Sequence, residues 1–155
     1  MKIERHVLDK QSYESSINLL LKDPILHSKL IVEGSVLASI NIANLVLHLS
    51  GKIKESEDLK HNKIEGIILR EGVFGTKSLE ISKLFRNLED LKYAVVHGSS
   101  VSKDDVEKSF SIYLALLKIF SEIEPKLKEV LSNERVLNKF DGKGVLWKES
   151  LVKVF

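Results

Sequence analysis

The stretch from residue 84 to residue 98 separates apolar from polar positions more clearly than the rest of the chain. Its apolar residues are spaced i, i+4, i+7 and i+11, so on a helix they form one seam: Leu84, Leu88, Leu91 and Val95. A second set with the same spacing is polar and forms a stripe on another side of the helix: Arg86, Asp90, Tyr93 and His97. We expect Gly98 to end this helix in a left-handed conformation, which places His97 in the last turn.

Residues 24–50 are the most apolar part of the chain and hold no charged side chain after Glu33. Asp23-Pro24 is typical of an N-cap followed by the first helical position, and Gly51 indicates the end of the helix. Apolar residues cover more than one face, so we predict a central, enclosed helix. Polar residues interrupt the run too often for a membrane span: Lys29, Glu33, Asn41, Asn44 and His48.

Three polar residues of this helix form a narrow strip, because Asn41, Asn44 and His48 are spaced i, i+3 and i+7. One interpretation is a solvated strip or a hydrogen-bond seam to another helix, since buried polar groups need partners. The other is a second wall of a cleft that His97 faces. The residues themselves leave both open.

The remaining elements are also predicted from apolar periodicity and from cap residues. We expect an extended arm over residues 1–9, a helix over about 10–22 and a third helix over about 57–70. The fourth helix, which carries His97, should begin near Thr76 or Ser78. The run Ser102-Lys103-Asp104-Asp105 is typical of a capping box and opens a fifth helix. Pro125 should break that helix near Glu124, with a helical continuation to about Lys139.

No segment alternates strictly between apolar and polar residues, so the predicted class is all-α, an antiparallel bundle of four to five main helices. The 155 residues fit a single domain over 1–155, with the core bundle over about 10–132. In the tail, 133–155, three large apolar residues should dock on the bundle or on a partner: Trp147, Leu151 and Phe155. The second helix carries more apolar surface than a small bundle covers, which predicts a homodimer.

Composition excludes several kinds of chemistry. Without cysteine, the chain cannot form disulfides, thiolate metal sites or a cysteine nucleophile. The net charge of +2 is too small to indicate nucleic-acid binding by itself. Four further histidines show no metal-ligand spacing, so we predict no metal and no cofactor: His6, His27, His48 and His61. The first ten residues are charged and lack an apolar core, which predicts a cytoplasmic protein without a membrane partner.

The long apolar helix, the lysine- and histidine-bearing segment after it, and a helix ending in LKYAVVHG (91–98) together resemble the HEPN superfamily over about residues 10–124. HEPN proteins are small helical bundles, commonly homodimers, and many are metal-independent endoribonucleases, including toxins of toxin–antitoxin pairs. Their motif is Arg, a polar residue that is often Asn, about three further residues, and His. His97 matches the motif. Lys92 stands at the arginine position, Tyr93 at the Asn position, and Ser99 where a tyrosine is often found.

The resemblance implies that His97 moves protons and that Lys92 stabilises charge on the scissile phosphate, without the planar fork of arginine. Together with the two polar strips, the resemblance gives a predicted set of RNA- or nucleotide-contacting residues: Arg86, Tyr93, Ser99, His48 and Asn44. Arg86 lies about 16 Å from His97 along the helix axis, which is too far for the two to share one phosphate within a chain. Across a dimer whose clefts meet, Arg86 could contact the same RNA strand.

Three interpretations remain at this level. The motif changes favour a degenerate HEPN-like dimer that binds RNA, a nucleotide or an antitoxin-like protein without cleaving. An active, metal-independent HEPN endoribonuclease that uses His97 is the second. The third is an unrelated helical protein-interaction module, in which a histidine before Gly98 is simply stabilised by the helix dipole and the last carbonyls.

Overall fold

The computed structural model describes residues 2–23, 26–54, 57–59, 64–98 and 102–131. All regular elements within these ranges are helical, which confirms the all-α class. In chain order they are α1 (Lys2–Leu20), α2 (Ser28–Leu49), α3 (Ile64–Glu71), the short 3-10 helix η2 (Gly75–Lys77), α4 (Ser78–His97), α5 (Lys103–Ile123) and α6 (Lys126–Leu131).

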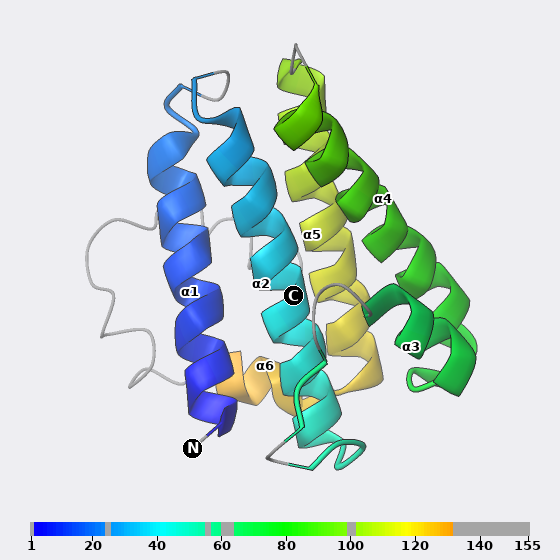
Figure 1. The fold of residues 1–155 in the computed structure, drawn as a ribbon. Coiled ribbons are helices and arrows are strands. Elements are labelled where there is room, and N and C mark those ends of the chain that lie inside the picture. Colours follow the sequence, from blue (N-terminus) through cyan, green and yellow to red (C-terminus); the bar gives the residue numbers. More distant parts are fainter. Residues whose placement is uncertain (1, 24–25, 55–56, 60–63, 99–101, 132–155) are drawn as a thin grey trace.

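Four long helices lie side by side and form the bundle (Figure 1). In that view α1 and α4 run upward, whereas α2 and α5 run downward. The helix α2 packs against α1, α4, α5 and α6, so it is the central helix, as the sequence predicts. The short α6 crosses the lower end of the bundle (Figure 1).

Most of α2 is enclosed by the other helices, with fifteen buried residues in its 22. By length and composition alone it could cross a membrane, but 78% of its most apolar window is buried inside the protein. Gly34 lets α1 approach closely, because a Cβ there would lie 3.1 Å from Cγ1 of Ile17. The helix ends as predicted at Gly51, whose φ is +67°. The Lys52 amide donates to the Leu47 carbonyl, which completes a Schellman motif.

Apolar spacing along the second, fourth and fifth helices predicts one shared core of eight residues, and the structure largely confirms it. Seven of its members are buried in one cluster: Ile40, Leu47, Leu88, Leu91, Val95, Tyr113 and Leu117. The eighth, Leu37, is only half-buried and lines a surface groove. The apolar seam of α4 therefore faces the core, with Leu84 packed at its edge.

The N-terminal boundary was predicted wrongly. Residues 2–9 form the first half of α1 and not an extended arm, and Val7 is fully buried. Polar residues occupy core-facing positions of this helix, so apolar periodicity does not reveal it: His6, Lys10, Gln11 and Glu14. The predicted helix over 10–22 is the second half of α1.

Three other helix ends differ from their predictions. The continuous helix α2 begins at Ser28 and not at Pro24, although the Asp23 carboxylate accepts a hydrogen bond from the Leu26 amide. Residues 57–59 are not helical, and within the described residues α3 runs from Ile64 to Glu71. Gly98 ends α4, but with φ −78° and ψ 155° it is extended and not left-handed.

The predictions around α5 are confirmed. Ser102 and Asp105 form the capping box through reciprocal side-chain and backbone hydrogen bonds. Pro125 separates α5 from α6, and the helical continuation reaches at least Leu131. The predictions for the tail over 133–155, with Trp147, Leu151 and Phe155, fall outside the described residues.

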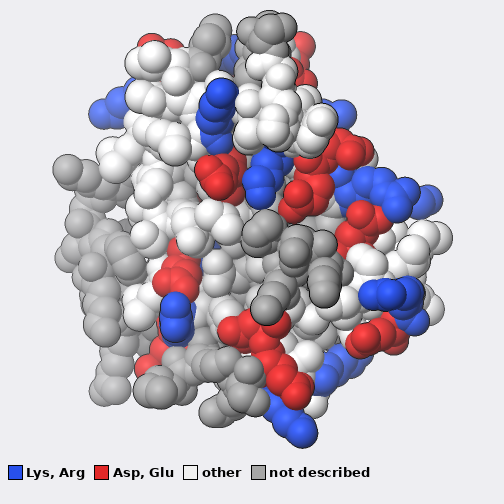
Figure 2. Space-filling model, in the orientation of Figure 1, with Lys and Arg blue, Asp and Glu red and all other residues white. Residues whose placement is uncertain are grey.

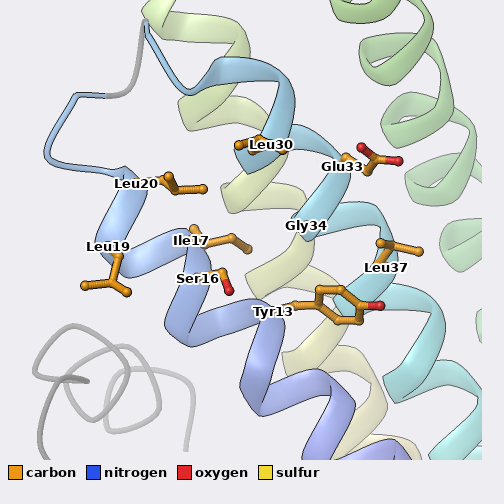
Figure 3. A pocket seen from close by; sticks show the side chains of 9 residues that line it. All are labelled: Tyr13, Ser16, Ile17, Leu19, Leu20, Leu30, Glu33, Gly34 and Leu37. Carbon is orange, nitrogen blue, oxygen red and sulfur yellow. The ribbon is translucent and has the colours of Figure 1, made fainter.

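The apolar faces of α2 are mostly covered within the chain, so a homodimer would have to use a different surface from the one the sequence suggested. Near the start of α2, three leucines form an exposed apolar surface: Leu19, Leu26 and Leu30, at 49%, 72% and 57% exposure. Beside it lies a groove of about 420 Å³ between the second half of α1 and the first half of α2 (Figure 3). We propose that a second copy of the chain packs on this surface.

Replacing Leu30 by glutamate should therefore shift the protein from dimer to monomer at micromolar concentration, because a charge at an apolar contact must be desolvated. Light scattering measures the change, and circular dichroism checks that helix content is retained. The exposed neighbour Lys29 offers a matched control, since Lys29→Glu adds negative charge outside the apolar surface. Wild-type protein that is already monomeric would contradict the proposal.

Candidate functional site

The end of α4 presents two aromatic side chains to solvent. Tyr93 is 70% exposed, which is unusual for a large aromatic residue. Its ring centroid lies 4.6 Å from that of His97, with the two planes tilted by 44°. His97 is the last residue of α4 and is exposed. Because both side chains are accessible, they can contact a ligand without any rearrangement of the core.

Lys92 belongs to another side of the same helix. It is half-buried. It lies five positions before His97, so the two side chains leave the helix about 140° apart at 100° per residue. Within one chain, the residues that the HEPN resemblance assigns to catalysis therefore do not point at the same phosphate, and Lys92 is instead adjacent to Tyr93 along the chain.

Arg86 and its surroundings differ from the positive groove that an RNA-binding site would favour. Its guanidinium Nη2 lies 2.5 Å from a carboxylate oxygen of Glu65, which links α4 to α3. Both partners are partly exposed, so solvent screens this ion pair. Figure 2 shows basic and acidic side chains interleaved on the face it displays, without a large patch of one sign.

The polar strip of α2 is a hydrogen-bond seam, which was the structural interpretation of its spacing. The Asn44 side chain donates to the Leu59 carbonyl at 3.2 Å and accepts from the Leu59 amide at 2.8 Å. It thereby fixes the backbone that follows α2. His48 contacts Asp58 in the segment after α2, and Asn41 contacts His6 in α1.

The residues predicted to contact RNA therefore do not form one site. Asn44 and His48 lie toward the C-terminal end of α2, at the lower end of the bundle in Figure 1. His97 ends α4 at the opposite end. The cleft wall that the sequence suggested for the α2 strip is absent from the surroundings of His97, and Ser99 lies outside the described residues.

A cluster of potential metal ligands forms where α1, α2 and the following segment meet. One ligand atom each of His6, His48 and Asp58 lies within 4.8 Å of the other two. The Nε2 atoms of His6 and His48 lie 3.3 and 2.9 Å from the same oxygen, Oδ1 of Asp58. The two imidazole rings are stacked, with centroids 5.3 Å apart. Both histidine side chains are buried, at 8% and 2% exposure, whereas that of Asp58 is 41% exposed.

Metal-ligand spacing in the sequence does not reveal this cluster, because its members come from distant parts of the chain. His6 lies 35 residues before Asn41, its hydrogen-bond partner, and 52 before Asp58, so no local spacing signals the group. The expected extended arm over 1–9 also removed His6 from consideration. Of the other histidines, His27 is half-buried at the start of α2, and His61 lies outside the described residues.

A further cluster of polar side chains is buried in the core. The Lys10 ammonium donates to Oε1 of Glu14 at 2.7 Å, and the Tyr113 hydroxyl donates to the same oxygen. Burial lowers the pKa of Lys10 and raises the pKa of Glu14, in each case against the opposing effect of the other's charge. Burial also raises the pKa of Tyr113 well above its usual value. Because these side chains are almost fully buried, we assign them to structure and not to ligand binding.

Comparison with known proteins does not assign the chain to a family. No protein-family model, no curated protein and no solved structure matches it. The resemblance to the HEPN superfamily therefore stays a prediction that depends on the residues around His97.

Proposed function

We propose that the protein is a HEPN-like RNA-binding protein that holds single-stranded RNA at the C-terminal end of α4 without needing to cleave it. The observation that carries this proposal is the exposed pair of rings formed by Tyr93 and His97. Unpaired bases stack on exposed aromatic side chains, and such stacking is tolerant of sequence.

The charges near this pair suit one phosphate better than a long phosphate track. Lys92 precedes Tyr93 and supplies a cation on the neighbouring side of the helix. Arg86, two helical turns earlier, already contacts Glu65. A strand that stacks a base on Tyr93 would thus gain most of its affinity from the rings and a smaller part from Lys92. We infer modest affinity with a shallow salt dependence, because few phosphates are neutralised.

Replacing Tyr93 by alanine should weaken binding of a short, fluorescently labelled single-stranded RNA about five- to hundredfold, the equivalent of about 1–3 kcal/mol for one stacked base. Fluorescence anisotropy at two salt concentrations measures both the affinity and its salt dependence. Tyr93→Phe should bind nearly as well as wild type, since it retains the stacking surface.

Asn87→Ala is a matched control for this experiment, because Asn87 is exposed on the same helix, away from the ring pair. Equal affinities for Tyr93→Ala and Asn87→Ala, or wild-type binding that does not respond to salt, would contradict the proposal. Such a result would favour the helical protein-interaction module.

The active endoribonuclease is the second candidate, favoured by the exposure of His97. Incubation of the protein with mixed RNA in EDTA distinguishes it from the binding protein. Cleavage that His97→Ala abolishes, while RNA affinity is largely kept, would assign the enzyme. In that case Lys92→Arg should raise the rate, because it restores the bidentate fork of the family motif. Intact RNA in every sample supports binding without cleavage.

A further inference from the structure

We infer that His6, His48 and Asp58 form a binding site for a divalent transition-metal ion such as zinc, at the end of the bundle opposite His97. This site is independent of the proposed RNA-binding surface, and it differs from the sequence prediction that the protein has no metal. Imidazole nitrogens with one carboxylate are a donor set that suits zinc and related ions, while magnesium and calcium prefer oxygen donors alone.

Two of the three separations between the donor atoms are close to those expected around one ion. Zinc binds histidine nitrogen and carboxylate oxygen at about 2.0–2.2 Å, so two ligands of a tetrahedral ion lie about 3.4 Å apart. The two distances from Asp58 Oδ1 to the histidine Nε2 atoms, 3.3 and 2.9 Å, are close to this value. Ligation requires each stacked ring to turn until its plane contains the ion, and the χ2 torsion of histidine is soft enough to allow this.

Asn41 prepares His6 as a ligand. The Asn41 amide nitrogen donates to the Leu37 carbonyl at 3.0 Å, so its oxygen faces Nδ1 of His6, also at 3.0 Å. An amide oxygen can only accept, hence Nδ1 of His6 carries a proton, and Nε2 is the ring nitrogen that faces Asp58. A proton on Nε2 would let His6 donate to the Asp58 carboxylate, and a metal ion bound between the two atoms would replace that proton. A histidine that binds a metal through one ring nitrogen usually donates a hydrogen bond from its other ring nitrogen to a nearby acceptor.

His48 supplies the second buried nitrogen. Its Nδ1 is buried and has no hydrogen-bond partner in the described part of the chain. No neighbouring group at Nδ1 therefore determines whether that nitrogen carries the proton. The tautomer of the ring depends on the group that contacts Nε2. A metal at Nε2 would place the proton on Nδ1. Asp58 completes the set from the exposed side, where solvent can supply the ion and a water ligand.

Binding would connect three separate parts of the chain: α1 through His6, α2 through His48, and the segment after α2 through Asp58. An ion that binds only when these segments are assembled stabilises the folded state by mass action. The site should consequently be detectable without any assay of function.

The test uses the untagged, full-length protein after treatment with EDTA and exchange into metal-free buffer. Titration with Zn²⁺ alone in a calorimeter should show one ion per chain, and Zn²⁺ should raise the melting temperature. Co²⁺ should give visible absorption bands that report nitrogen and oxygen ligation. Mg²⁺ at the same concentration should neither bind nor raise the melting temperature. Failure of Zn²⁺ and Co²⁺ to bind above the level seen with Mg²⁺ would overturn the inference.

Asp58→Asn is the decisive variant, because its exposed side chain can change with little effect on packing. It should weaken Zn²⁺ binding at least tenfold, as should His48→Gln, whose helix content is checked by circular dichroism. Asn41→Leu should weaken binding about tenfold by removing the acceptor behind His6. His27→Gln, which alters a histidine outside the cluster, should bind like wild type. Equal Zn²⁺ affinities for Asp58→Asn and His27→Gln would show that the cluster is only a hydrogen-bond network.

Discussion

Replacing Glu14 alone by leucine should lower the free energy of unfolding by about 3–5 kcal/mol, because it removes the carboxylate that Lys10 and Tyr113 contact inside the core. Lys10 is then left as a buried ammonium group without that carboxylate, or it must give up its proton. The Tyr113 hydroxyl loses its acceptor as well. Urea unfolding at neutral pH, followed by circular dichroism, measures the loss.

The paired replacement Lys10→Met with Glu14→Leu is the control, and it should recover most or all of the stability. Burial raises the pKa of Glu14, a shift that favours folding at low pH and whose contribution is lost as pH rises through the folded-state pKa. Burial lowers the pKa of Lys10, a shift whose contribution is present at high pH and lost as pH falls. Both shifts oppose ionisation of the buried pair, so its desolvation offsets much of the attraction between the two charges, and apolar residues of similar volume should fold at least as well. A double variant less stable than Glu14→Leu would contradict this account.

Leu91→Ala should lower the free energy of unfolding by about 2–5 kcal/mol, because it leaves a cavity between α4 and the rest of the core. Leu91 is only 8% exposed and belongs to the main core cluster. Leu79 lies on the same helix at 54% exposure. Leu79→Ala should therefore change stability by no more than about 0.5 kcal/mol. Similar losses in the two variants would mean that α4 presents a different face to the core.

The sequence predicts the core-facing side of α4 because apolar spacing along a helix directly specifies which side is buried. Leu88, Leu91 and Val95 follow that spacing and are buried. The capping box at Ser102 and the break at Pro125 were also predictable, since both depend on residues within one turn of each other.

The first half of α1 could not be predicted in the same way. Its inward positions carry His6, Lys10 and Glu14, which a pattern of hydrophobicity assigns to solvent. His6 and Glu14 contact partners far along the chain, Asn41 and Tyr113, and Lys10 joins this network through Glu14, one turn away on α1. Polar residues in a core are specified by their partners, and the partners are known only after the helices are placed.

The two candidate sites also differ in whether the local sequence or the tertiary structure reveals them. Local sequence determined the exposed stripe that ends in Tyr93 and His97, because its members are one turn apart on a single helix. Tertiary structure alone decided that His48 belongs with His6 and Asp58, and that it lies at the other end of the bundle from His97. The physical reason is that a helix fixes the direction of side chains within itself, whereas packing between helices fixes which distant side chains meet.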